Sequence, residues 1–337
     1  MHRKRTTTGK KRRTVWKLIL CFLLFEFIFT GATAPFLVFY GPFENVKRTI
    51  VGAAMTTLSH QYIAKLFLSD EEIKKILAGN TAESVEQNNV ETLNFENKHD
   101  SSIEREDISD DKKNFKGYIL IIHDPTRVKV GYSKKLGTAG ELTSRIAKNN
   151  NAVAAINGGG FKDSSSGDSK WTGTGGKPTG ILMSNGKVVS NDIEDPDEKS
   201  EVMAITNKGQ LLVGNHSLND MKERGVTEAI SFGPALIVNG KGTIKSGDGG
   251  WGIAPRTAIG QRSDGAMIFL VIDGRQTKSI GASLRDVQNI MIKYGAINAT
   301  NLDGGSSSTM YYEGEVINNT CDPLGERSVP SAIYVKP

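Results

Sequence analysis

The feature that most constrains this chain is an uninterrupted apolar run near its N-terminus. Residues 18–40 read LILCFLLFEFIFTGATAPFLVFY and contain one charged residue, Glu26. An α-helix of about 20 apolar residues is long enough to cross the hydrocarbon core of a bilayer. We therefore expect a transmembrane helix over residues 18–40.

The charges that flank the run predict its orientation. Eight lysines and arginines lie in residues 1–17, so the rest of the chain has a net charge of −3 although the whole chain has +5. Basic residues beside a membrane helix stay on the cytoplasmic side. The sequence thus predicts a basic cytoplasmic tail, a single-pass signal-anchor in the cell membrane and an extracytoplasmic C-terminal part. This use of the basic residues gives no reason to expect nucleic-acid binding.

A cleaved signal peptide is the alternative to an uncleaved anchor. Ala32-Thr33-Ala34 has the small-x-small form of a cleavage site. Pro35 follows directly and the apolar run continues beyond it, which favours the anchor. Whether the helix is cleaved stays open at this point.

Two segments follow the apolar run. Residues 41–80 are expected to form a juxtamembrane helical stalk, in which Ser69-Asp70-Glu71-Glu72 has the form of a capping box. Residues 81–115 are polar and charged and contain few β-branched or aromatic residues, a composition typical of a linker. The domain boundary is therefore predicted near residue 115.

From residue 116 onward the chain consists of short β-runs separated by turn dipeptides. Asn185-Gly186 and Asn239-Gly240 suit the type I′ turn of a β-hairpin. One helix is clear: Ser283-Leu284-Arg285-Asp286 begins it with a capping box, and Gly295 ends it. Residues 116–337 are expected to form one large α+β domain, mostly antiparallel β-sheet with a few helices.

Glycine-framed loops that follow strands carry the candidate functional residues. Asp303 leaves a predicted strand and enters a loop of glycines and hydroxyls, which can bind phosphate oxygens through N–H and O–H groups. Arg256 begins a strand that should be buried, and its planar fork suits phosphate. Asp273 and Arg275 end another apolar strand, and Asp273 is the second candidate catalytic carboxylate. The remaining candidates for substrate binding are Asn157, Gly158, Gly159, Ser231, Gly233, Gly304, Gly305, Ser306, Ser307 and Arg327.

Several other kinds of site are not expected. His123 and His216 are the histidines of the predicted domain, and neither lies in a glycine-rich loop, which argues against a Ser-His-Asp triad. Cys321 is the single cysteine of the domain, which excludes a CxxC zinc site. Residues 173–177 resemble a phosphate-binding loop, but Pro178 stands where Ser or Thr is needed.

The metal content stays unknown at this stage, and no cofactor is certain. Asp273 and Asp303 leave a divalent cation open, because paired carboxylates can coordinate one. The sequence offers no ligand set that stands out.

Taken together, six segments of residues 116–337 resemble the phosphodiester glycosidase family, which includes N-acetylglucosamine-1-phosphodiester alpha-N-acetylglucosaminidase. In layout the chain is most similar to membrane-anchored, exopolysaccharide-associated bacterial members. The segments are INGGGF (156–161), SFGPALIVNG (231–240), APRTAIG (254–260), VIDGR (271–275), NLDGGSSSTM (301–310) and GERSVP (325–330).

The resemblance implies hydrolysis of the glycosidic bond of a sugar-1-phosphodiester, releasing sugar and a phosphomonoester. The substrate would resemble an N-acetylglucosamine-1-phosphodiester, as a phosphate-linked glycan in a cell-envelope or exopolysaccharide polymer. By position in the motifs, Asp303 would act as nucleophile or base. Arg256 and Arg327 would grip the phosphate, and Asn157 and Asp273 would orient the sugar hydroxyls.

Three alternatives remain open from the sequence. One is a phosphodiesterase that cuts the P–O bond of teichoic-acid-like polymers, and another is a non-catalytic polysaccharide-binding module. The third is a scaffold in a polymer-export complex. The sequence identifies neither the sugar, the aglycone nor the oligomeric state.

Overall fold

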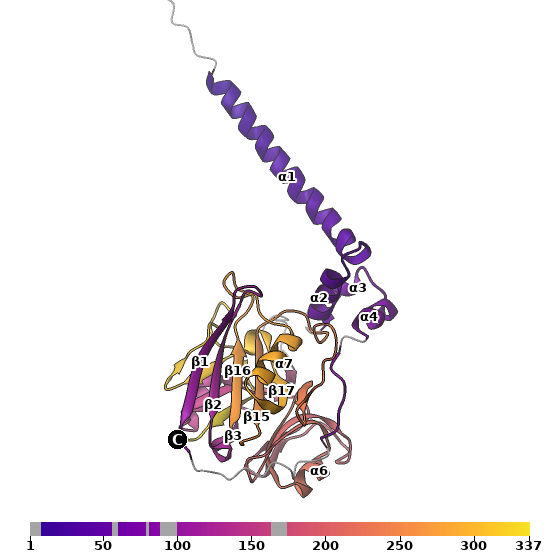
Figure 1. The fold of residues 1–337 in the computed structure, drawn as a ribbon. Helices are drawn as coiled ribbons and strands as arrows, with labels where there is room; N and C mark the ends of the chain where they lie inside the picture. The colour runs from indigo at the N-terminus through magenta and orange to yellow at the C-terminus, as the bar shows by residue number, and fades with distance from the viewer. Residues whose placement is uncertain (1–7, 56–59, 79–80, 88–99, 163–173) are drawn as a thin grey trace, which may run out of the picture. The chain divides into compact units, whose positions relative to one another are not determined.

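A computed structural model describes residues 8–55, 60–78, 81–87, 100–162 and 174–337. They belong to two compact units, residues 1–77 and residues 78–337 (Figure 1). Residues 1–7 of the predicted basic tail lie outside the described residues.

The N-terminal unit consists of helices α1 (Thr8–Tyr40), α2 (Glu44–Met55), α3 (Tyr62–Lys65) and α4 (Asp70–Leu77). Within α1, residues Val15–Tyr40 are long and apolar enough to cross a membrane, and the helix continues through Pro35. The predicted capping box at the start of α4 is confirmed, because Ser69 donates from N and Oγ to Glu72 Oε2 at 2.8 Å each. A small core joins the end of α1 to the later helices; its residues are Phe39, Val51, Ala54, Ala64, Leu68 and Ile73.

The largest sheet of the C-terminal unit has seven strands, each antiparallel to its neighbours. Helix α7 (Leu284–Lys293) covers one face of this sheet (Figure 1). In spatial order the strands are β1 (Ile103–Asp110), β2 (Phe115–Ile122), β16 (Met267–Ile272), β15 (Arg256–Arg262), β17 (Ala296–Leu302), β13 (Ala235–Val238) and β14 (Lys241–Gly242).

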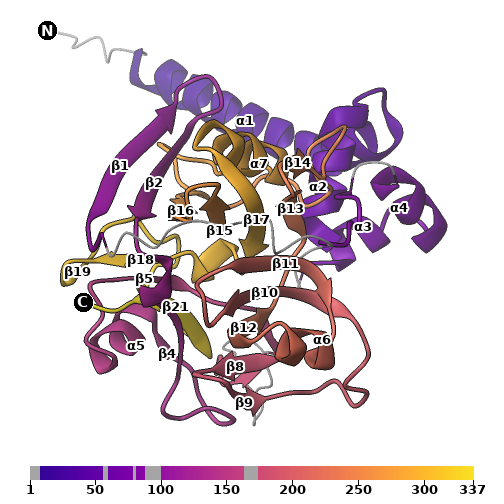
Figure 2. The same ribbon diagram turned by 60° about the horizontal axis from the view of Figure 1, so that its bottom comes forward.

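Two five-stranded antiparallel sheets accompany it (Figure 2). The first has the order β11 (Leu211–His216), β10 (Ser200–Thr206), β12 (Val226–Ser231), β8 (Leu182–Ser184) and β9 (Lys187–Ser190), and helix α6 (Leu218–Glu223) packs on it. The second has the order β19 (Glu315–Val316), β18 (Met310–Tyr312), β5 (Ala154–Asn157), β21 (Ser331–Val335) and β3 (Val128–Tyr132), with helix α5 (Thr143–Asn149) against it. One apolar core draws side chains from all three sheets, among them Phe269, Met203 and Ile333. Two short pairs of strands are also present: β4 (Glu141–Leu142) with β20 (Ser328–Val329), and β6 (Phe161–Lys162) with β7 (Lys177–Pro178).

The predicted α+β class with mostly antiparallel sheet is confirmed, and so are its local signals. Asn185 and Gly186 both have positive φ, 50° and 75°, as a type I′ turn between β8 and β9 requires. The capping box of α7 is present, with Ser283 and Asp286 bonded in both directions.

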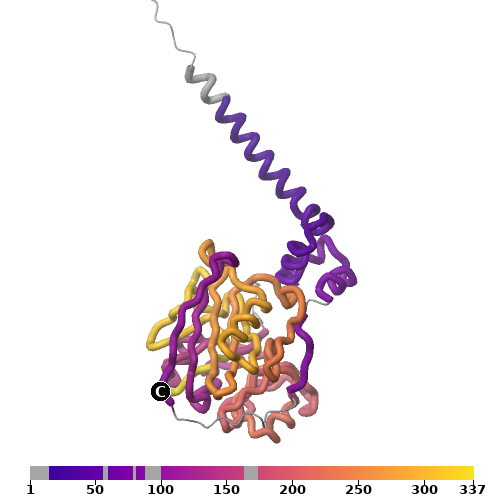
Figure 3. The backbone as a smooth tube through the Cα atoms, viewed as in Figure 1, coloured from indigo at the N-terminus to yellow at the C-terminus, as the bar shows by residue number. Residues whose placement is uncertain are grey.

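The predicted linker over residues 81–115 differs from the structure, and the domain boundary near 115 was wrong. Residues 103–110 form β1, which pairs along its whole length with β2 (Figure 3). As the edge strand it buries little, so Glu104, Arg105 and Glu106 remain exposed and its composition looks like that of a linker. Residues 88–99 lie outside the described residues.

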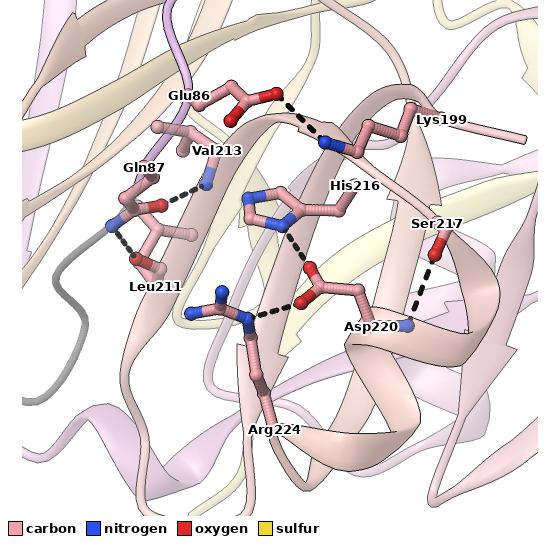
Figure 4. Close-up of polar contacts among 9 residues, drawn as sticks. All are labelled: Glu86, Gln87, Lys199, Leu211, Val213, His216, Ser217, Asp220 and Arg224. Atoms are coloured by element: carbon pink, nitrogen blue, oxygen red, sulfur yellow. Dashed lines mark hydrogen bonds and ion pairs between the residues drawn. The ribbon is translucent and has the colours of Figure 1, made fainter. Parts of the chain in front are cut away.

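Residues 81–87 are also part of the C-terminal unit. Gln87 is only 2% exposed, and its side-chain amide completes the free edge of β11. Nε2 donates to the carbonyl of Leu211 (3.2 Å), and Oε1 accepts from the N–H of Val213 (2.8 Å; Figure 4). Beside it, Glu86 forms an ion pair with Lys199 at 2.8 Å.

His216 lies next to this contact and joins β11 to α6. Its Nδ1 is 2.6 Å from Oδ2 of Asp220, whose other oxygen accepts from Nε of Arg224 at 2.6 Å (Figure 4). Because His216 is buried and bonded to the helix, its geometry is that of a structural connection between a strand and a helix.

We expect N-terminal truncations to separate the contributions that β1 and residues 81–87 make to the stability of the C-terminal unit. A 78–337 fragment should unfold cooperatively, whereas 116–337, which loses β1, should melt about 10 °C lower and aggregate through the uncovered edge of β2. Each kcal/mol shifts the melting temperature of a domain of this size by roughly 2–4 °C. Circular dichroism and light scattering measure both effects.

A 100–337 fragment is the matched control for that comparison, because it keeps β1 and loses only Gln87 and its neighbours. It should fall between the other two. If 116–337 stays monomeric with the melting temperature of 78–337, β1 contributes nothing to the fold.

Candidate functional site

The candidate site is built around the loop that follows β17. Asp303 is the first residue of this loop, and its main chain is held from two directions. Its N–H donates to the carbonyl of Gly158 (3.2 Å), and its carbonyl accepts from Nδ2 of Asn157 (2.6 Å). The end of β5 therefore fixes where the Asp303 carboxylate emerges, half-buried in the surface of the unit.

Asn157 is fully buried and connects several segments at once. Besides its bond to Asp303, its Oδ1 accepts from Oγ1 of Thr257 (2.7 Å) and from the N–H of Thr309 (3.1 Å). The predicted contact of this amide with sugar hydroxyls is therefore not what the structure shows. The amide positions both ends of the 303–309 loop.

Two guanidinium groups approach the glycine and serine residues after Asp303. A Cβ at Gly305 would lie 3.4 Å from Nη2 of Arg275, so the absence of a side chain lets that guanidinium approach the backbone. Gly305 has φ +62°, which also favours glycine. On the next residue, Oγ of Ser306 accepts from Nη1 of Arg327 at 3.3 Å.

Arg327 is further oriented by stacking, because its guanidinium carbon lies 4.9 Å from the ring centre of Phe161. Such a cation–π contact fixes a planar group without neutralising it. Arg275 and Arg327 thus contact consecutive residues of one short loop. Their guanidinium groups place positive charge beside the residues that follow Asp303 in the chain.

Arg256 does not lie where a phosphate-binding arginine was expected. It is 4% exposed, and its guanidinium donates to the carbonyls of Ala282 (3.0 Å), Trp251 (3.0 Å) and Gly252 (2.6 Å). Burial lowers the pKa of Arg256 to about 10. The sequence predicted an anion as the partner of this guanidinium, but its partners are backbone carbonyls. Because two of these carbonyls belong to residues 251 and 252, Arg256 orders the 249–255 loop.

That loop supports the candidate site through Pro255, whose carbonyl accepts from the N–H of Gly305 at 2.9 Å. Gly304 packs equally closely, since a Cβ there would lie 2.8 Å from the same oxygen. Other parts of the same chain therefore approach residues 304 and 305 so closely that glycine is favoured there, independently of any need to leave room for a ligand.

Asp273 is also buried, at 3% exposure, and is bonded inside the protein. Oδ1 accepts from the N–H of Asn319 (3.0 Å) and from Nδ2 of Asn318 (3.3 Å), and Oδ2 accepts from the hydroxyl of Tyr118 (3.4 Å). Burial raises the pKa of Asp273. This geometry differs from the predicted direct role of Asp273 in catalysis or sugar binding.

Asn318 transmits the position of Asp273 to the far end of the loop. Its Nδ2 also donates to the carbonyl of Ser308 (3.1 Å), and its Oδ1 accepts from the N–H of Met310 (2.7 Å). Sequence reasoning did not single out Asn318, because an asparagine in an exposed-looking NNT segment carries no signal of burial. Thr257 and Thr309, by contrast, stand inside recognised motifs.

The other predicted residues near β5 and β12 serve close packing of the two sheets. A Cβ at Gly159 would lie 2.2 Å from Cγ2 of Ile230. Ser231 accepts from the N–H of Ile181 through Oγ (2.8 Å), and the carbonyl of Gly233 accepts from Nδ2 of Asn301 (3.0 Å).

Glu201 is a carboxylate of this region that sequence reasoning missed. Its Oε2 lies where a side chain at Gly233 would project, 2.0 Å from a Cβ built there. Burial raises the pKa of Glu201, although a hydrogen bond from the N–H of Ala235 opposes the shift. No signal marks it, because it stands within a strand.

The loop also contains buried hydroxyl groups. Within the part of the chain that the structure describes, the side-chain oxygens of Ser307, Ser308 and Thr309 have no hydrogen-bond partner. The same described residues contain no group of three or more His, Cys, Asp or Glu side chains arranged to hold a metal ion.

Comparison with known proteins gives several matches over the same region. A family model described as phosphodiester glycosidase matches residues 150–336. The SPbeta prophage-derived uncharacterized protein YomE of Bacillus subtilis (strain 168) is 28% identical over 219 residues, which are 63% of this chain and 31% of that protein. Bovine N-acetylglucosamine-1-phosphodiester alpha-N-acetylglucosaminidase is 36% identical over 70 residues, 21% of this chain and 13% of the enzyme. The chain thus spans less than a third of the length of either relative.

Solved structures show the same fold. The catalytic domain of zebrafish N-acetylglucosamine-1-phosphodiester alpha-N-acetylglucosaminidase, auto-inhibited by its pro-peptide, superposes with a TM-score of 0.55 at 27% identity, over 70% of this chain and 82% of that one. A putative exported protein of Burkholderia pseudomallei K96243 matches with a TM-score of 0.51 at 17% identity, over 66% and 74% of the two chains, and supports the fold alone. Because the family model covers more than half of the residues, including Asp303, Arg275 and Arg327, this chain belongs to the phosphodiester glycosidase family.

Proposed function

We propose that the C-terminal unit hydrolyses the glycosidic bond of a sugar-1-phosphodiester in a cell-envelope or exopolysaccharide polymer. The observation that carries this proposal is the pair of guanidinium groups on one loop, Arg275 over Gly305 and Arg327 on Ser306. Two arginine forks directly after a half-buried carboxylate suit a phosphodiester. The sugar would then lie toward Asp303.

Asp303 acts as nucleophile or base in this proposal. Phosphate is a good leaving group that hardly needs protonation, so one carboxylate and a cationic clamp suffice where most glycosidases need two carboxyl groups. Ser306 is the half-exposed hydroxyl of the loop, and because it is bonded to Arg327 it lies where a phosphate held by that guanidinium would be.

The remaining site residues act through others. Arg256 holds the 249–255 loop under Gly305, and Asn157 and Asp273 position the two ends of the 303–309 loop. The phosphate clamp is therefore assigned to Arg275 and Arg327, in place of the pair Arg256 and Arg327 that the sequence suggested.

The location of the enzyme follows from its N-terminal helix. We infer that α1 is an uncleaved anchor in the cell membrane, with the basic tail in the cytoplasm and the C-terminal unit outside. Its apolar length supports this, as does the continuation of the helix through Pro35, directly after Ala32-Thr33-Ala34, to Tyr40.

Replacing Asp303 tests the central assignment. Asp303→Asn should lower the rate of sugar release from a sugar-1-phosphodiester by about 10³-fold, the range seen when a general acid–base or nucleophilic carboxylate is removed. Its melting temperature should change little, because asparagine keeps the size of the side chain and the main-chain bonds of residue 303 to Gly158 and Asn157 are retained.

Asp111→Asn, in the exposed turn between β1 and β2, serves as the matched control and should keep full activity. Unchanged turnover in Asp303→Asn would remove this residue from the mechanism. Glycan retention without turnover in the unaltered protein would favour a binding module.

Two conservative arginine substitutions should have opposite effects. Arg256→Lys should lower the free energy of unfolding by about 2–4 kcal/mol, because a lysine cannot reach all three carbonyls and leaves buried acceptors unpaired. Arg327→Lys should leave stability nearly unchanged and raise KM about tenfold, a loss of roughly 1.4 kcal/mol in phosphate binding.

Thermal unfolding and steady-state kinetics on both variants separate the roles. A stable Arg256→Lys protein with a raised KM would return Arg256 to the phosphate clamp.

Hydrolysis in water enriched in heavy oxygen distinguishes the two bonds that water can attack. Cleavage of the C–O bond puts the label on the sugar, and cleavage of the P–O bond puts it in the phosphomonoester. The phosphomonoester is the diagnostic product, because a free sugar exchanges its anomeric oxygen with water. We expect an unlabelled phosphomonoester by mass spectrometry; a labelled one identifies a P–O-cleaving phosphodiesterase.

A further inference from the structure

The N-terminal unit exposes large apolar side chains beside the end of α1. On α3 and the turn that follows it, Tyr62 is 64% exposed and Leu66 is 74% exposed. At the start of α2, Phe43 and Val46 are 53% and 47% exposed. Side chains of this kind in a small helical unit that already has its own core indicate a surface with an apolar partner.

These residues lie on consistent helix faces. Tyr62, Lys65 and Leu66 are spaced i, i+3 and i+4, so they project from one side of α3 while Ala64 faces the core. Phe43 and Val46 have the same spacing at the start of α2. An aromatic residue, a lysine and a leucine on one face are typical of a helix that lies in the headgroup region of a bilayer.

The length of α1 predicts where this face stands relative to a membrane. Twenty residues of α-helix span about 30 Å, the thickness of the hydrocarbon core. Counted from Lys17, the last basic residue before the apolar run, the outer edge of that core falls near Leu37. A tilt of about 20° moves this point by only one or two residues. The last turn of α1 therefore lies at the interface.

Direct contacts fix α3 at the level of that turn. The ring of Phe67 stacks on Phe39 with centres 4.7 Å apart, and it meets the edge of Phe36 at 5.8 Å. The hydroxyl of Tyr40 donates to the carbonyl of Phe67. Tyr62 and Leu66 lie within five residues of Phe67 along the chain. They therefore lie at the depth of the membrane interface, however α1 is rotated about its own axis.

We propose that Tyr62 and Leu66, together with Phe43 and Val46, seat the helical unit in the outer headgroup region of the bilayer that α1 spans. The surface continues the membrane contact of α1, since Phe36, Leu37 and Tyr40 are exposed on the helix that α3 packs against. Lys65 reaches from the same face to lipid phosphates. The proposal rests on the membrane anchor of the proposed function and extends it from one helix to an interfacial cap.

Nitroxide labels on the full chain in phosphatidylcholine–phosphatidylglycerol vesicles test this surface. Tyr62→Cys and Leu66→Cys are labelled separately in a Cys21→Ser, Cys321→Ser background. Collision with dissolved oxygen reports lipid, and collision with a water-soluble nickel chelate reports solvent. Glu71→Cys, exposed in the first turn of α4, is the matched aqueous control within the same unit.

We expect both labels to collide with the nickel chelate severalfold less, and with oxygen severalfold more, than the label at 71. Nickel collision rates equal to those at 71 overturn the proposal. So does low collision with both reagents, which would show that another protein or a second copy of the chain covers the face.

A label on the native Cys21, in a Cys321→Ser chain, separates this proposal from the one on which it rests. Cys21 is exposed on α1 within the apolar run. Cys21 in lipid with positions 62 and 66 in water removes the interfacial cap and leaves the anchor. Cys21 in water removes the anchor itself.

Discussion

The buried amide of Asn157 is the contact on which the candidate site depends. Its three hydrogen bonds reach Thr257 on β15 and both ends of the loop after β17, at Asp303 and Thr309. β5 and β15 belong to different sheets, so one side chain sets the position of the carboxylate relative to both. An amide suits this place because it donates and accepts at once, and neither a carboxylate nor an apolar side chain of similar size can do both. The loop can therefore keep two glycines without losing a defined geometry.

The arginines divide into two kinds according to what satisfies their donors. Arg256 lies inside the protein, where its guanidinium donates to three backbone carbonyls that hold it in place, and burial lowers its pKa. Arg327 is only half-buried, and its guanidinium contacts the face of Phe161 and the hydroxyl of Ser306. A half-exposed guanidinium beside the glycine and serine residues of the loop can reach a bound phosphate, whereas one buried against backbone carbonyls cannot. This difference in burial, and not the presence of an arginine in a motif, is why we propose Arg327 and not Arg256 for the phosphate clamp.

Local signals in the sequence were enough for the fold class, the hairpin turns and the helix that Ser283 caps, because each depends on residues a few positions apart. The same reasoning located the Asp303 loop, where glycines and hydroxyls follow a strand. It failed where the partner of a residue is distant in sequence. Arg256 bonds to Ala282, and Asp273 reaches the loop through Asn318. β1 was missed for a related reason, since an edge strand is held by the backbone of β2 and its side chains remain polar.

The chain enters the C-terminal unit along a path that touches the supports of the site. Thr81 forms a bridge with Gly249, and the N–H of Glu83 donates to the carbonyl of Thr243 at 3.0 Å. The 249–255 loop then carries the carbonyls that hold Arg256 and the Pro255 oxygen that holds Gly305. Gln87 continues the path by bonding to the carbonyl of Leu211 and the N–H of Val213 at the edge of β11, and Gln261 accepts from the N–H of Leu211. Residues 81–87 are thus built into the same layer of contacts as the 303–309 loop, so they belong to the C-terminal unit and not to a linker ahead of it.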